Sequence, residues 1–322
     1  MKGVLKVLVA GMLVLGGCAT AGPQTRYDSL RTQVVRQDWP SDYPNGAVLQ
    51  TPHYRIHTTV SNPAVLKMLP GFLEQAHGQY VAFTGISPRG QRVGDVYLMA
   101  DRQQWAAVTR KVVRDRPNSY MSIEAGGYCY RGVSVFWDIG YARTLPVAAH
   151  EGLHQFFMFH LRDALPMWLE EGLCVMMESY RVDATGNVAF DPDRRDAHAD
   201  ELRTALRQHW RPLRQLLSMD AGEAIAGTNQ EAVSYYAQLW ALAHYLRSRP
   251  EYRAGLERML ADAQAGRVKK ELGVGFFEGF SLMSDGRRYN QALSERFFRH
   301  YITTDLDGFE RAYTQHARRL AE

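Results

Sequence analysis

The stretch His150-Glu151-Gly152-Leu153-His154 is an H-E-x-x-H motif. Histidines at positions i and i+4 project from the same face of a helix, so two neutral imidazoles can bind one Zn²⁺ ion. The Glu beside the first His can accept a proton from water that such a metal activates. The alternative is that both histidines are ordinary core residues, because a motif this short arises by chance in on the order of a few per cent of chains with this His content.

The motif sits in a strongly apolar pattern, formed by Val147, Ala148, Ala149, Leu153, Phe156, Phe157 and Phe159. This pattern predicts a buried helix that has Pro146 at its first position and Thr144 near its cap. An unpaired buried polar group costs about 1–3 kcal/mol, so buried His and Glu side chains need partners, and a metal supplies them. Gly152 costs a helix about 1 kcal/mol relative to Ala, which a close contact with another element would explain.

A catalytic zinc usually has three protein ligands and one open position. Glu171 follows His154 by 17 positions, on a second predicted helix from Trp168 to Tyr180. This spacing is enough for the first helix to end and the second to return beside it. Glu170 has nearly the same spacing, so the residues alone leave both carboxylates open as the third ligand.

The chain resembles the gluzincins, which are thermolysin- and aminopeptidase-like zinc peptidases, and most closely a branch of bacterial envelope proteins without an assigned function. The resemblance spans roughly residues 50–320. It is carried, in order, by Gly126-Gly127-Tyr128, the motif at 150–154, the Pro166–Gly172 segment P-x-W-L-x-E-G, and Tyr235-Tyr236-Ala237-Gln238-Leu239-Trp240. It implies a gluzincin-like fold, and it implies that the Glu directly before Gly172 is the third ligand, which is Glu171.

The predicted mechanism uses one Zn²⁺ per chain, held by His150, His154 and Glu171. The metal would lower the pKa of its water to about 7, and Glu151 would act as general base and pass the proton to the leaving amine. By resemblance Tyr236 would stabilise the oxyanion. Its neighbour Tyr235 is a second candidate for this role, and packing is the other explanation for both.

Two further features bear on the site. Glu178 follows Glu171 by seven residues and either holds a ligand His by a hydrogen bond or is a solvated carboxylate. The segment Gly126 to Trp137 predicts a strand pair with a Gly-rich turn. In gluzincins a strand at this place lines the cleft and pairs with extended substrate, and an ordinary sheet strand is the alternative.

The beginning of the chain predicts export and lipidation. A basic start and an apolar run over residues 1–17 are typical of a signal peptide, and Leu15-Gly16-Gly17-Cys18 resembles the lipobox of bacterial lipoproteins. Lipid on Cys18 would anchor the protein to the membrane. The same resemblance implies, from Ala19, the outer membrane facing the periplasm. An ordinary signal peptide is the alternative. Residues 18–48 are polar and predict a flexible tether.

The remaining composition narrows the partners. The chain has 38 Lys and Arg against 34 Asp and Glu, a net charge of +4 that is too small and dispersed to indicate nucleic-acid binding. The resemblance to zinc peptidases implies a peptide or protein substrate. Cys129 and Cys174 could pair in an oxidising envelope, stay free and buried, or add a thiolate ligand to zinc.

The predicted fold class is α+β, with a small mixed sheet packed on the zinc helix and a mostly helical subdomain after it. The catalytic domain is predicted over residues 49–322, with a sheet-containing half at 49–140 and a helical half at 141–322 that carries the zinc site. One long helical segment is predicted from Asp196 to Leu217. The expected function is an envelope-anchored zinc metallopeptidase. The alternatives are a zinc hydrolase of another amide or ester, and a non-catalytic envelope binding or assembly module.

Overall fold

The computed structural model describes residues 32–39, 43, 45–115, 117–121, 123, 126–183, 187–275 and 286–322. The predicted signal peptide at 1–17 and the predicted lipidation residue Cys18 lie outside the described residues. Among the helices of the described ranges, none has the length and apolar character that crossing a bilayer requires.

The bounds of the elements follow the chain order. The strands are β1 (Val35–Asp38), β2 (Ala47–Gln50), β3 (Tyr54–Thr58), β4 (Gly94–Met99), β5 (Gly127–Tyr130), β6 (Val133–Trp137), β7 (Tyr180–Val182) and β8 (Val188–Phe190). The helices are α1 (Pro63–Thr84), α2 (Arg102–Val112), the short 3₁₀ helix η2 (Pro117–Ser119), α3 (Tyr141–His160), α4 (Met167–Met176), α5 (Ala199–Thr204), the π-helix η3 (Ala205–His209), α6 (Leu213–Ser218), α7 (Ala221–Ala226), α8 (Asn229–Ser248), α9 (Pro250–Ala265), α10 (Val268–Glu271), α12 (Gly286–Tyr301) and α13 (Leu306–Leu320).

The main sheet is mixed and has the strand order β1-β2-β3-β4-β6-β5. Strands β3, β4 and β6 run parallel to one another. Antiparallel pairing adds β5 beside β6 on one side, and β2 and then β1 beside β3 on the other. This confirms the α+β class and the predicted hairpin of β5 and β6. Strand β1 lies within the stretch predicted to be a tether, so the predicted boundary at residue 49 is too late and the sheet begins at Val35.

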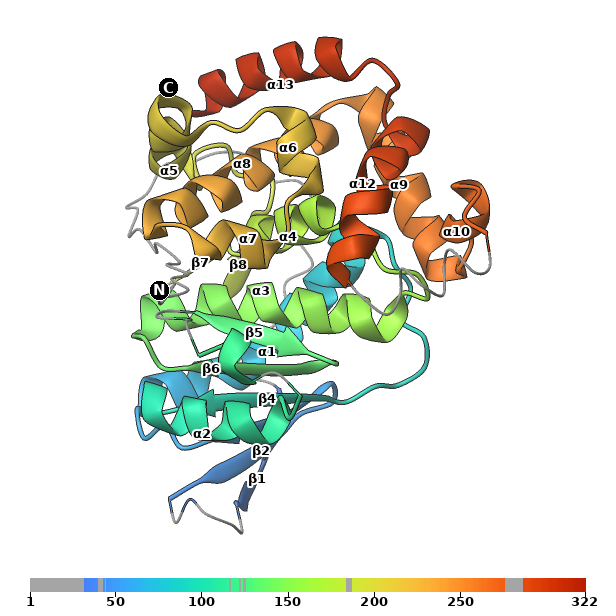
Figure 1. Cartoon of the computed structure of the whole chain (residues 1–322). Coiled ribbons are helices and arrows are strands. Elements are labelled where there is room, and N and C mark those ends of the chain that lie inside the picture. The colour runs from blue at the N-terminus through green and yellow to red at the C-terminus, as the bar shows by residue number, and fades with distance from the viewer. Residues whose placement is uncertain are drawn as a thin grey trace.

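Helices cover both faces of the sheet. Residues of β3, β4 and β6 pack against α1 and α3 in one apolar cluster that includes Ile56, Leu98 and Phe136. The other face is covered by α2, whose Trp105 packs with Trp137. Figure 1 shows this arrangement, with α3 beside β5 and β6 and the later helices on its opposite side. Helix α3 is therefore an internal layer and not a surface helix.

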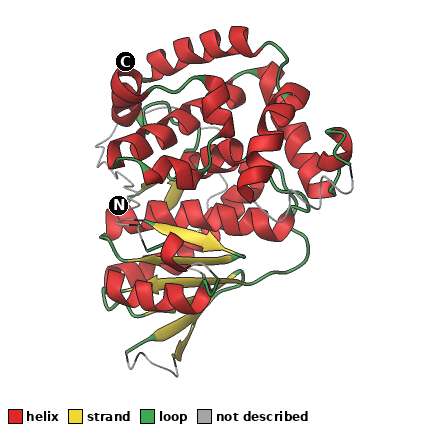
Figure 2. Ribbon diagram, in the orientation of Figure 1, coloured by secondary structure: helices red, strands yellow, loops and turns green. Residues whose placement is uncertain are grey.

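The second half of the chain is mostly helical, as predicted, and Figure 2 shows the six-stranded sheet at the opposite end of the molecule, apart from the small β7–β8 pair. Its core is built around α4 and α8, and it includes Leu153, Phe156 and Phe157 from the later turns of α3. The earlier turns of α3, with Val147 and Ala148, belong to the sheet-side core. One helix thus joins the two halves, and the H-E-x-x-H motif lies where the two cores meet.

Three predicted helix boundaries are wrong. The helix predicted from Trp168 to Tyr180 ends at Met176, and Tyr180 begins β7. Helix α3 begins at Tyr141, so Pro146 lies inside it, and the N-cap is Gly140. The Thr144 hydroxyl, inside the helix, accepts a hydrogen bond of 3.0 Å from Ile139 N, in the segment just before the helix. The predicted helix from Asp196 to Leu217 is broken between η3 and α6, because Pro212 has no N–H group and restricts the residue before it to extended backbone.

The Gly inside the motif has a steric reason. A Cβ on Gly152 would lie against the hydroxyl of Tyr80, a fully buried residue of α1. That hydroxyl donates a hydrogen bond of 2.7 Å to Ala149 O, so it cannot turn away without losing a buried partner. The close contact expected from the sequence is therefore the packing of α1 on α3.

Gly152→Ala should destabilise the protein by about 1–3 kcal/mol through overpacking, measured by the urea midpoint. In a Tyr80→Phe background the same change should cost less, because the contact with the hydroxyl is removed while ring atoms at 3.3 and 3.4 Å remain, and Ala is the better helix former. A Gly152→Ala single variant as stable as wild type would contradict this account.

Candidate metal centre

Hydrogen bonds from both neighbouring strands hold α3 in place. Ser134 Oγ on β6 donates to Glu151 O at 3.2 Å. Gln155 Nε2 on α3 donates to Asp95 O at 3.0 Å and to Gly132 O at 2.7 Å, which links the helix to β4 and to the β5–β6 turn. These bonds fix the rotation of α3 about its axis, and thereby the direction in which the motif side chains point.

Close packing of α4 on α8 positions the next part of the site. A Cβ on Gly172 would approach Leu239 O to 2.8 Å and Ala243 Cβ to 3.1 Å. Only Gly allows the two helices to come this near. Glu171, directly before it, therefore sits on a helix held against α8 on one side and α3 on the other.

Three donor atoms from α3 and α4 converge on one point. The two Nε2 atoms of His150 and His154 are 3.2 Å apart. Glu171 Oε2 is 3.3 Å from the first and 3.5 Å from the second. In a tetrahedral zinc site with ligand bonds of about 2.0–2.1 Å, donor atoms lie about 3.3–3.4 Å apart. The three measured edges fit that geometry.

The opposite nitrogen of each imidazole faces a carboxylate. His150 Nδ1 is 2.8 Å from Glu178 Oε1, and His154 Nδ1 is 2.8 Å from Glu170 Oε1. A neutral imidazole in this arrangement would donate its Nδ1 proton to the carboxylate and direct its Nε2 lone pair at the other donors. Three acceptors that face one another repel unless a positive charge lies among them.

Without a metal, the pKa shifts describe an ion-pair group in which protonated imidazoles balance the charge of Glu171. Burial would raise the pKa of Glu171, but the two imidazoles hold it far below its usual value. Burial would lower the pKa of His150, but its contacts with Glu171 and Glu178 raise it well above normal. Glu171 Oε2 is buried and forms no hydrogen bond within the described part of the chain. An ion between the three donors would satisfy this oxygen.

A thiol is a further candidate donor at the same place. Donor atoms of His150, His154 and Cys174 all lie within 4.8 Å of one another. Cys174 is fully buried, and Cys129 is also a free thiol, so the two do not form a disulfide in this structure. The structure therefore presents a possible metal site at the two imidazoles, with Glu171 at measured contact distance and Cys174 close by.

The proposed general base and oxyanion residue are near the site. Glu151 is 7% exposed, and its burial raises the pKa of its carboxyl. The ring of Tyr236 meets the His150 ring edge-on, with centroids 6.4 Å apart. Tyr235 is fully buried beneath it, and its hydroxyl has no hydrogen-bond partner among the described residues. Of the two tyrosines, Tyr236 is the one in ring contact with a motif histidine.

The sequence reasoning missed the role of Glu170 and left that of Glu178 open. Glu170 is the partner of His154, although we considered it only as an alternative ligand. The sequence feature that could have indicated this role is that Glu170 directly precedes Glu171. Two consecutive carboxylates on a helix that crosses α3 can contact the two different ring nitrogens of one His. Glu178 contacts His150, so of the two explanations given for it the hydrogen bond to a ligand His is the one observed. It lies just past the end of α4, where spacing on a helix no longer describes its direction.

Glu178→Gln should weaken zinc binding about 10–100-fold, measured by chelator competition, because the amide no longer fixes and polarises His150. Glu170→Gln should have the smaller effect of the two, since its side chain is 26% exposed against 9% for Glu178. Glu257→Gln on the exposed face of α9 serves as the control. Equal affinity in all three variants would show that neither carboxylate supports the metal.

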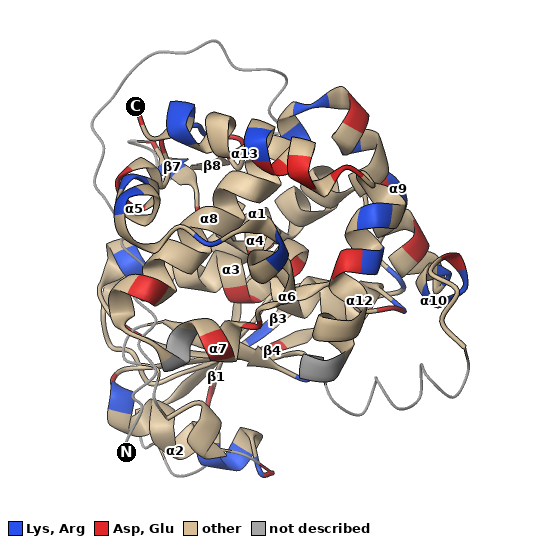
Figure 3. Cartoon of the chain, turned by 45° about the horizontal axis from the view of Figure 1, so that its top comes forward, with Lys and Arg blue, Asp and Glu red and all other residues tan. Residues whose placement is uncertain are grey.

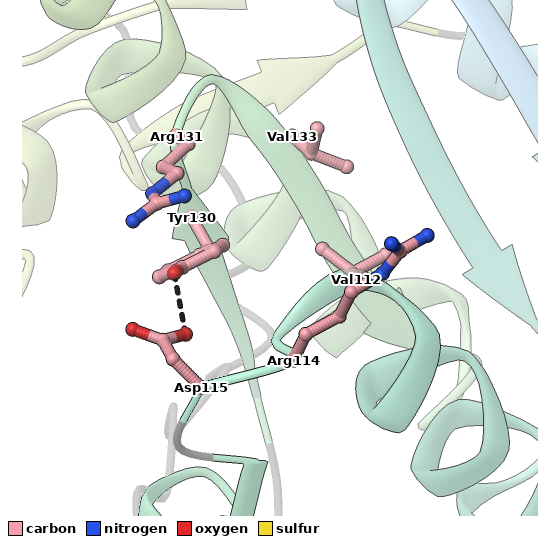
Figure 4. A pocket seen from close by; sticks show the side chains of 6 residues that line it. All are labelled: Val112, Arg114, Asp115, Tyr130, Arg131 and Val133. Carbon is pink, nitrogen blue, oxygen red and sulfur yellow. Dashed lines mark hydrogen bonds between the residues drawn. The ribbon is translucent and has the colours of Figure 1, made fainter.

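A surface pocket lies apart from the residues of the metal centre. This pocket of about 300 Å³ lies between the end of α2 and the β5–β6 turn, lined by Val112, Arg114, Asp115, Tyr130, Arg131 and Val133 (Figure 4). The Tyr130 hydroxyl donates to Asp115 Oδ1 at 2.7 Å across its side. None of the donors of the metal centre lines it. Figure 3 shows basic and acidic residues interspersed along α9 and α13.

Comparisons with protein-family models, with curated proteins and with solved structures found no match to this chain.

Proposed function

We propose that this chain is an envelope-anchored zinc-dependent peptidase. The observation that carries the proposal is the triangle of His150 Nε2, His154 Nε2 and Glu171 Oε2, with edges of 3.2–3.5 Å. The two carboxylates behind the imidazoles add to it, because they fix the tautomer that a metal needs. Bound Zn²⁺ would supply Lewis acidity to a substrate carbonyl and make water a better nucleophile.

The remaining chemistry belongs to side chains of the chain. Glu151 follows His150 directly and lies in the same buried region. Burial raises the pKa of its carboxyl, which makes it a stronger base for the proton of the attacking water and a suitable acid toward the leaving amine. Tyr236 is the proposed hydrogen-bond donor to the developing oxyanion. Its position against the His150 ring supports this role.

The place of β5 in the sheet supports a peptide as substrate. The strand order puts β5 at the edge of the sheet, next to β6. Its first residue, Gly127, packs so closely on Val147 of α3 that a Cβ there would approach the Val147 side chain to 3.1 Å. An extended peptide paired with β5 would therefore run alongside the zinc helix, which is the arrangement that strand addition requires.

The proposed location rests on the sequence alone. The leader at 1–17 and the lipobox-like stretch that ends at Cys18 favour a lipid anchor in the bacterial envelope, with the enzyme facing the periplasm.

A proteomic comparison of cell envelopes tests the peptidase proposal. Cells with wild-type protein should contain peptide fragments that are missing from cells with Glu151→Gln, at equal amounts of both proteins. The sequences of those fragments would define the cleavage preference. Identical fragments and phenotypes in both strains would favour the non-catalytic module instead.

A further inference from the structure

The metal centre holds one more donor than a catalytic zinc site uses. A zinc hydrolase needs three protein ligands and an open position. Here the two imidazoles have two neighbours of different chemical kind, the carboxylate of Glu171 and the thiol of Cys174. The buried thiol lies within 4.8 Å of a ring nitrogen of each imidazole, which is within reach of a shared metal ion.

The helix geometry places both neighbours on the side of α4 that faces α3. Cys174 follows Glu171 by three residues, so the two side chains lie on one helix face, one turn apart. Gly172 between them keeps α4 pressed on α8, so this face cannot turn away from the imidazoles. Glu171 Oε2 is buried without a hydrogen-bond partner in the described ranges, which is independent evidence that a ligand belongs at this point.

We propose that Cys174 is an alternative third ligand, which competes with Glu171 for the metal held by His150 and His154. The inference rests on the proposed zinc centre and adds a second coordination mode to it. Thiolates prefer soft and borderline ions, and carboxylates prefer hard ones, so the two modes differ in metal preference. With Glu171 bound the site suits a hydrolase, and with Cys174 bound it favours thiophilic ions.

The exchange is a balanced ligand substitution without oxidation or reduction. The S–H bond of Cys174 breaks as its sulfur bonds to the metal, and the bond between Glu171 and the metal breaks. The released carboxylate takes up the proton. Metal ions deprotonate a coordinating thiol, so the buried position of Cys174 does not prevent the step.

Cobalt substitution of the full chain distinguishes the two modes. Co²⁺ bound to a thiolate gives a near-ultraviolet charge-transfer band, while Co²⁺ bound by nitrogen and oxygen alone shows only its visible bands. We expect the thiolate band in wild type, a stronger band in Glu171→Gln, and none in Cys174→Ala or Cys174→Ser. Cys129→Ser, which removes the other free thiol, is the matched control and should keep the band.

Metal preference gives a second readout. Cys174→Ala should weaken Cd²⁺ binding by at least about tenfold more than Mn²⁺ binding, since only the softer ion loses its preferred donor. Visible Co²⁺ bands without a thiolate band, in both wild type and Glu171→Gln, would overturn the role of Cys174 and leave the peptidase proposal standing. Failure of wild type to bind Co²⁺ or Zn²⁺ at all would overturn both.

Discussion

Glu151→Gln is expected to lower kcat by about 10²–10⁴-fold and to leave one zinc per chain in place. The amide has nearly the size of the carboxylate, so it preserves the packing of α3, but it cannot accept the proton of the attacking water. Glu151 contributes no donor to the triangle formed by the two imidazoles and Glu171. The loss should therefore appear in the chemical step and not in metal content.

The measurement is hydrolysis of a peptide library by matched amounts of wild type and variant, with zinc determined by elemental analysis on the same samples. Wild-type activity that disappears with chelator and returns with Zn²⁺ is the positive control. Full activity in the variant would remove Glu151 from the mechanism. Loss of zinc together with activity would mean that the residue supports the metal instead.

His150→Ala and His154→Ala are each expected to abolish stoichiometric zinc binding. Each change removes one corner of the donor triangle and leaves Glu171 Oε2, already without a hydrogen bond in the described residues, with fewer contacts. A ligand that binds only the folded state stabilises it by about 2.7 kcal/mol at a hundredfold excess over its Kd. Zinc should therefore raise the Tm of wild type but not that of either variant.

His209→Ala is the control for this experiment, because His209 lies on η3, apart from the donors of the site. It should keep both the zinc and the rise in Tm. A wild-type Tm that zinc leaves unchanged, or an equal rise in His150→Ala, would contradict the assignment of the site.

The sequence predicted the elements of the fold better than their limits. The strand pair predicted over Gly126 to Trp137 is present as β5 and β6, because β-branched and aromatic residues alternate there with small ones. Strand β1 was missed, because its residues Val35–Asp38 are exposed and pair only at the sheet edge. Such a strand has no apolar alternation, and only tertiary pairing defines it.

The parts of the site that helix periodicity determines could be predicted from the sequence. The i and i+4 spacing of the two histidines, and a carboxylate on the next helix, were sufficient to predict a converging group. The role of Glu170 and the proposed role of Cys174 depend on how α4 crosses α3, and the close packing of Gly172 on Leu239 of α8 holds α4 in that position. Interhelical packing of this kind leaves no local pattern in the sequence.

A crystal of the zinc-loaded chain, measured above and below the zinc absorption edge, tests the central claim most directly. The account predicts one anomalous peak per chain at about 2.0–2.2 Å from His150 Nε2, His154 Nε2 and Glu171 Oε2 in the hydrolytic state. A zinc-loaded crystal with no peak between these atoms, or with its zinc bound elsewhere on the chain, would contradict it.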